Sequence, residues 1–135
     1  KKQAQVIKKD GEGSIHQARL KLERIIKMAQ DLESDDNNKR VAATQEIIKD
    51  ALSAEVRTDW YTPGTDDVQP SEYRILLCWG GPVVRIVGDL NKYGGPETAT
   101  LEHWDQCLPY KKYDTTEEEL AAMLRYVSTF YFGKF

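Results

Sequence analysis

The stretch that most constrains the fold is residues 72–104, EYRILLCWGGPVVRIVGDLNKYGGPETATLEHW. It holds runs rich in β-branched and aromatic residues at about 72–79, 83–90 and 97–105. The glycine-containing segments 80–82 and 91–96 separate these runs, and connections this short join antiparallel neighbours. A further run with a period of two precedes them at about 54–60. We therefore predict an antiparallel meander of about four strands over residues 54–105.

Polar and apolar side chains alternate on the run 83–90. Successive side chains of a strand point to opposite faces of the sheet. One face then carries Arg85, Val87 and Asp89, and the other carries Val84, Ile86 and Leu90. The alternation predicts that the polar residues mark a face which serves as a ligand wall.

The N-terminal part is predicted to be helical. Residues 1–13 are polar and contain two glycines, so we expect a flexible lead-in followed by Ser14 as a helix N-cap. Apolar residues then recur every three or four positions, at Ile15, Ala18, Leu22, Ile25, Ala29 and Leu32. This pattern and a second one at about 38–53 predict an αα-hairpin over 14–53. The first stripe is assigned to the chain's own core, with a subunit interface as the alternative.

A third helix is predicted over residues 115–132, after an irregular link at 106–114. Thr115 or Thr116 is its expected N-cap, with Glu118 and Glu119 as capping-box partners three residues later. The aromatic cluster at 130–132 is interpreted as core or as a protomer contact. The predicted fold class is α+β, in a single domain that comprises a helical hairpin, the meander and a C-terminal helix.

Composition excludes several function classes. The net charge of -3 argues against a general nucleic-acid binder, although a few local arginines suffice for a small anionic ligand. No apolar run approaches the roughly 20 residues that span a bilayer, and the N-terminus lacks the apolar segment of a signal peptide. We therefore expect a cytoplasmic protein without a membrane or nucleic-acid partner.

Catalytic and metal-binding motifs are not found in the sequence. His16 and His103 are far apart and have no metal-ligand spacing, and the two cysteines are too few for a standard zinc site. No nucleophile motif and no phosphate-loop motif occurs. We expect no enzymatic activity, no cofactor and no metal.

The strongest binding signal is the association of arginine with aromatic residues. Arg57 precedes Trp60, Arg85 is near Trp79 across a turn, and Arg125 adjoins Tyr126. Guanidinium groups bind phosphates in a bidentate manner, and aromatic rings stack on bases. The set therefore indicates a nucleotide-like ligand. The alternative is that Trp60 and Trp104 are core residues and that the arginines only face solvent.

The segments EVRTDWYTPG, EYRILLCWGGPVVRIVGDL and YVSTFYFG resemble the first-described family of phage Thoeris anti-defence proteins, over most of the chain from Glu55 onward. The resemblance implies a sponge that binds cyclic ADP-ribose isomers and holds them intact in the host cytoplasm. It also implies a homo-oligomer with the pocket between protomers, and a separate site for cyclic oligonucleotides in some members.

This resemblance implies roles for particular residues. Trp79 is the expected ring stacker, and Asp89 or Asn91 is the expected partner of a ribose or base. The arginines expected to bind phosphates are Arg57, Arg85 and Arg125. Arg24 and Lys27 are candidates for a second anionic site. The alternative function is an acidic viral inhibitor that binds a host defence protein directly.

Overall fold

The computed structural model describes residues 4–65, 68–106 and 108–132, with side chains from residue 13 onward. In chain order the elements are α1 (Ala4–Leu32), α2 (Asn37–Asp50), β1 (Ser53–Thr58), β2 (Pro70–Cys78), β3 (Val83–Asp89), β4 (Thr100–Trp104), β5 (Lys111–Lys112) and α3 (Glu117–Val127). This order confirms the predicted α+β class, with two helices, an antiparallel sheet and a C-terminal helix.

The sheet is an antiparallel meander in which the strands lie side by side in chain order. It has five strands among the described residues, one more than predicted. The additional strand is β5, where Lys111 pairs with His103 and Lys112 with Glu102. We expected an irregular link here, because a strand of two residues carries no periodicity that a sequence pattern can reveal.

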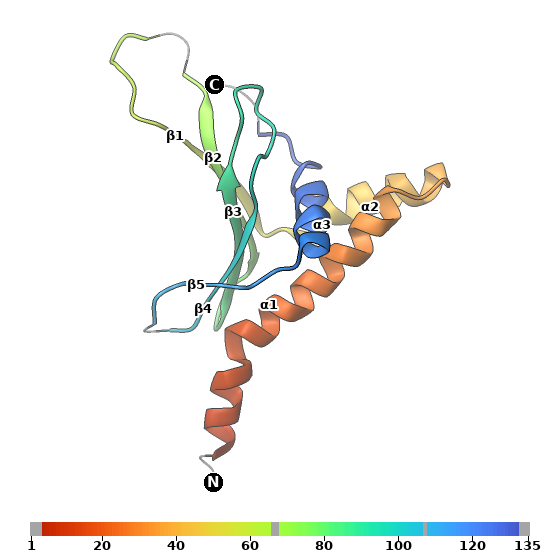
Figure 1. Ribbon diagram of the computed structural model, residues 1–135, viewed down its shortest axis with the longest axis vertical. Coiled ribbons are helices and arrows are strands. Elements are labelled where there is room, and N and C mark those ends of the chain that lie inside the picture. Colours follow the sequence, from red (N-terminus) through yellow and green to blue (C-terminus); the bar gives the residue numbers. More distant parts are fainter. Residues whose placement is uncertain (1–3, 66–67, 107, 133–135) are drawn as a thin grey trace.

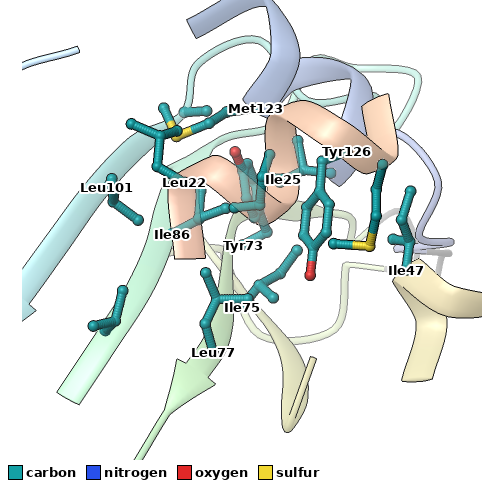
Figure 2. Packing of buried hydrophobic residues seen from close by; sticks show 14 of the residues in the cluster. Leu22, Ile25, Ile47, Tyr73, Ile75, Leu77, Ile86, Leu101, Met123 and Tyr126 are labelled. Atoms are coloured by element: carbon teal, nitrogen blue, oxygen red, sulfur yellow. The ribbon is translucent and has the colours of Figure 1, made fainter. Parts of the chain in front are cut away.

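The helices lie on one side of the sheet (Figure 1). The predicted stripe on α1 packs into the core, with Leu22 and Ile25 against the sheet residues Ile75, Ile86 and Leu101 (Figure 2). Helix α3 contacts α1 and adds Met123 and Tyr126 to the same cluster. The stripe therefore serves the chain's own core, as the sequence indicated.

Helix α1 differs from the prediction at its start. It begins at Ala4 and not at Ser14, so the residues from 4 to 13 that were expected as a flexible lead-in are helical. The first turns lie at an angle to the rest of the helix (Figure 1). The Ser14 N–H donates to Oδ1 of Asp105 at 2.9 Å, and a side chain that engages the helix backbone in this way is a recognised cause of a bend.

The N-terminal ends of the other two helices follow helix-capping chemistry closely. Asp36 caps α2, and its side chain accepts a hydrogen bond from the Asn38 N–H. Thr116 caps α3, and Glu119 completes the predicted capping box by accepting from the Thr116 N–H at 2.8 Å. Helix α3 ends at Val127, earlier than the predicted 132.

Candidate functional site

The sheet has one face covered by helices and one open face. On β3, Val84 and Ile86 are buried under the helices, whereas Arg85 and Val87 are partly exposed and Asp89 is exposed. This alternation confirms the predicted division of the strand. The open face is where charged side chains from several strands meet.

Three ion pairs cross the strands of the open face. Their members are Arg57 with Glu72 at 2.9 Å, Arg74 with Glu55 at 2.8 Å, and Arg85 with Glu102 at 2.8 Å. Each pair is directly opposite in the strand register, so the sheet pairing itself sets these contacts. Of the three arginines, Arg74 was not among the predicted site residues. The alternation of side chains along β2 could have placed it on the open face.

A shallow hollow of about 390 Å³ lies over these pairs. Its lining includes all three arginines and all three glutamates, so its formal charges cancel. An anionic group that binds here must compete with the glutamates for the guanidinium donors. The hollow is therefore suited to a ligand that offers both charge and other contacts, rather than to a free phosphate ion.

Arg85 is held on both sides. Its guanidinium carbon lies 3.6 Å from the centre of the Tyr110 ring, and its Nε donates to Glu102. The Tyr110 ring stacks in turn with Trp104, with centroids 5.9 Å apart. The side chain of Arg85 is only 20% exposed as a result, so it is less available to a ligand than Arg57.

A second hollow, of about 710 Å³, adjoins the first at Arg57 and Glu72. Its other walls include Trp60 and Tyr61, from the segment after β1. Trp60 is fully exposed, so the interpretation of this tryptophan as core is wrong. The hydrogen bond from Arg57 to Glu72 and the nearby negative charge raise the pKa of Arg57 further, and its guanidinium stays charged at all relevant pH values.

The remaining predicted site residues are spread over the molecule. Asp89 lies on the open face opposite Glu72, which makes that part of the face acidic. Asn91 borders a third hollow, together with Trp60 and Tyr61. The Asn91 Oδ1 accepts the N–H groups of Tyr93 and Gly95, at 2.8 and 3.0 Å, and so stabilises its own turn.

Trp79 and Arg125 lie away from the open-face hollows. Trp79 is 69% exposed in the turn after β2 and does not line the hollows described above. Arg125, on α3, forms an ion pair at 3.0 Å with Glu33, in the turn directly after α1, in the helical layer. The two residues expected to bind a second anionic ligand already form ion pairs within the chain, Arg24 with Asp50 and Lys27 with Asp31.

Ser14 and His103, which are buried, form a polar cluster with the partly exposed Asp105, and this cluster joins α1 to β4. The Ser14 hydroxyl donates to Oδ2 of Asp105 at 2.6 Å and lies 2.8 Å from Nδ1 of His103. Since Ser14 has only one hydroxyl proton, Nδ1 of His103 carries the proton in the second contact. Burial lowers the pKa of His103, Asp105 opposes this effect, and Lys111 adds to it.

This cluster contains the residue types of a hydrolytic triad, but its geometry serves the fold. Ser14 is 0% exposed, so a substrate has no access to its hydroxyl. The aspartate bonds to the serine and its backbone, whereas in a catalytic triad it orients the histidine. Gly13 permits the approach, because a Cβ there would lie 2.7 Å from Oδ1 of Asp105. The cluster is therefore a clamp between α1 and β4.

No helix in the described part of the chain is long and apolar enough to cross a membrane. Within the same residues, no group of three or more His, Cys, Asp or Glu side chains is placed to hold a metal ion. Comparisons with family models, with curated proteins and with solved structures found no match to this chain.

Proposed function

We propose that the protein binds and sequesters a small cyclic nucleotide, such as a cyclic ADP-ribose isomer, in the host cytoplasm and does not degrade it. One observation supports this function best. Arg57 and the fully exposed ring of Trp60 border the same hollow of about 710 Å³. A volume of this size is in the range of pockets that hold small ligands.

The chemistry of the hollow fits the two parts of a nucleotide. The planar guanidinium of Arg57 has five N–H donors, and within the described part of the chain its hydrogen bond to Glu72, at 2.9 Å, engages one of them. The other donors are available to the oxygens of a pyrophosphate. The rings of Trp60 and Tyr61 offer stacking surfaces to a base, and such stacking tolerates any base because every base has a π-face.

Among the described residues that line the hollow, we find no accessible nucleophile next to a general base. This supports storage of the ligand rather than its turnover. The carboxylates near Arg57 are held by other contacts. Glu72 pairs with Arg57, and Asp59 accepts from the Ser71 hydroxyl at 3.1 Å. Neither is a candidate for an activated general base, because both are solvated and engaged.

Calorimetric titration with a cyclic ADP-ribose isomer tests this function. We expect binding, loss of it in Arg57→Gln and Trp60→Ala, and wild-type binding in Arg125→Gln, whose guanidinium lies in the helical layer. After incubation and heat denaturation, the ligand should be recovered intact. No binding by the wild-type protein, or equal binding by all variants, would refute the proposal, and recovery of a cleaved ligand would refute sequestration.

A second candidate function is inhibition of a host defence protein by direct binding. The observation that favours it is the neutral array of three cross-strand ion pairs, which matches a protein surface of alternating charge better than a phosphate. Co-purification with a purified defence enzyme, unaffected by added nucleotides and lost on Arg74→Glu, would favour this function over sequestration.

A further inference from the structure

The strand β1 is an exposed edge of the sheet. It comprises Ser53–Thr58 and pairs with β2 on one side only. Its side chains are exposed or partly exposed throughout, although Val56 packs against the core. The strand contains no proline, and the unpaired N–H and C=O groups of an edge strand are a template for pairing with another chain. The charges that β1 carries decide which strand can pair with it.

The charges on β1 are self-complementary. Glu55 and Arg57 lie two residues apart on the open face, on either side of Val56. If two copies of β1 pair antiparallel about a two-fold axis at Val56, Glu55 of each copy lies directly opposite Arg57 of the other. Opposite charges that face each other across strands stabilise the pairing, and the two-fold symmetry makes the contact occur twice.

The same register extends the ion pairs already present within each chain. Glu55 is paired with Arg74, and Arg57 with Glu72. Across the joined sheets, each row therefore alternates in sign over four strands, from Arg74 and Glu55 of one copy to Arg57 and Glu72 of the other. Each charge on β1 gains a second neighbour of opposite sign and meets no like charge in its own row.

Neighbouring registers are unfavourable. Side chains on one face remain together only if one strand slides by two residues relative to the other. A shift in one direction places Glu55 opposite Glu55 of the second copy. A shift in the other direction places Arg57 opposite Arg57, and Glu55 opposite Asp59. Like charges that face each other across strands are destabilising, so the charge pattern selects a single alignment.

We propose that β1 pairs antiparallel with β1 of a second copy of this chain about a two-fold axis at Val56, which joins two five-stranded sheets into one. This pairing is compatible with the proposed ligand site but does not depend on it. Arg57 has donors enough for Glu72, for Glu55 of the second copy and for a ligand oxygen.

Charge reversal on β1 tests the pairing. Glu55→Arg gives the strand two positive charges and Arg57→Glu gives it two negative charges, so each variant alone places like charges opposite each other. The matched controls are Glu46→Arg and Lys49→Glu, which make the same kind of change on exposed positions of α2. Sedimentation of each protein is measured from about 10 µM to about 1 mM, because an edge-strand interface is small.

We expect the wild type and both controls to dimerise, and each β1 variant to dissociate with a dimer constant at least about tenfold weaker, because two attractive pairs become repulsive. A 1:1 mixture of Glu55→Arg with Arg57→Glu should restore a dimer, since each strand then meets its opposite. This rescue also shows that both variants are folded. A monomeric wild type, dimers that persist in the variants, or a mixture that fails to associate would each overturn the proposal.

Discussion

Replacement of Ser14 by alanine is the most direct test of the clamp between α1 and β4. The change removes one buried hydroxyl and leaves the backbone N–H of residue 14 bonded to Asp105. Two contacts are lost, at 2.6 Å to Oδ2 of Asp105 and at 2.8 Å to Nδ1 of His103. The Nδ1–H of His103 then loses its acceptor, and His103 is buried.

The expected loss of stability follows from the two contacts. A hydrogen bond to a charged group contributes about 1.5–3 kcal/mol, and a neutral one about 1 kcal/mol. Asp105 is partly exposed, so water replaces some of its lost contact and we expect a total of about 2–3 kcal/mol. For a chain of 135 residues, about 4 °C per kcal/mol translates this into a fall in Tm of roughly 8–12 °C.

Urea denaturation and a thermal scan, both followed by circular dichroism, measure the effect. The control is Ser128→Ala, which removes an exposed hydroxyl that donates to the Leu124 carbonyl, and which should change stability by less than about 0.5 kcal/mol. If Ser14→Ala lowers stability no more than this control, the two contacts of the Ser14 hydroxyl do not stabilise the fold, and the argument for their structural role fails.

Three further outcomes are expected. Burial holds the pKa of His103 below its ordinary value of 6.5, so the unfolded chain binds the proton more readily and stability falls as the pH drops below about 6.5. The midpoints of urea denaturation at about pH 7.5 and about pH 5 measure this loss of stability. In His103→Gln the two midpoints should differ less than in the wild type. Tyr126→Phe removes the 2.9 Å hydrogen bond to Asp50. It should lower the free energy of unfolding, measured by urea denaturation, by about 1.5–3 kcal/mol and leave the far-ultraviolet circular dichroism unchanged. Gly88→Ala places a Cβ 2.0 Å from a backbone carbonyl oxygen and should cost about 3 kcal/mol or more, whereas Gly81→Ala, with nothing within 4 Å, should not.

The parts of the fold that could be predicted are those encoded by neighbours along the chain. The pleat makes side chains alternate, so Arg85 and Ile86 had to lie on opposite faces. The two members of the capping box, Thr116 and Glu119, are only three positions apart, so it can be recognised without knowledge of the remaining chain. Both predictions were confirmed because the physics that produces them is local.

Features that depend on distant residues could not be predicted. Ser14 resembles an N-cap, and its N–H does meet a carboxylate, but that carboxylate belongs to Asp105, 91 residues later. Trp60 continues the period-two pattern of β1, yet the register shifts between Arg57 and Thr58 and the strand ends, so the indole faces solvent. Arg125 was assigned to the ligand site because it adjoins Tyr126 in the sequence. In the structure it lies on α3, in the helical layer, where it pairs with Glu33.

The two faces of the sheet separate stability from recognition. The helix-covered face holds the fully buried residues Ile75, Ile86 and Leu101, and loss of such side chains destabilises a protein strongly. The open face holds exposed ion pairs such as Arg74 with Glu55, which contribute little to stability because water screens them and the side chains lose entropy. Open-face variants should therefore unfold at nearly the wild-type urea concentration. A loss of ligand or of dimerisation in such a variant can then be assigned to the surface itself, and not to a damaged fold.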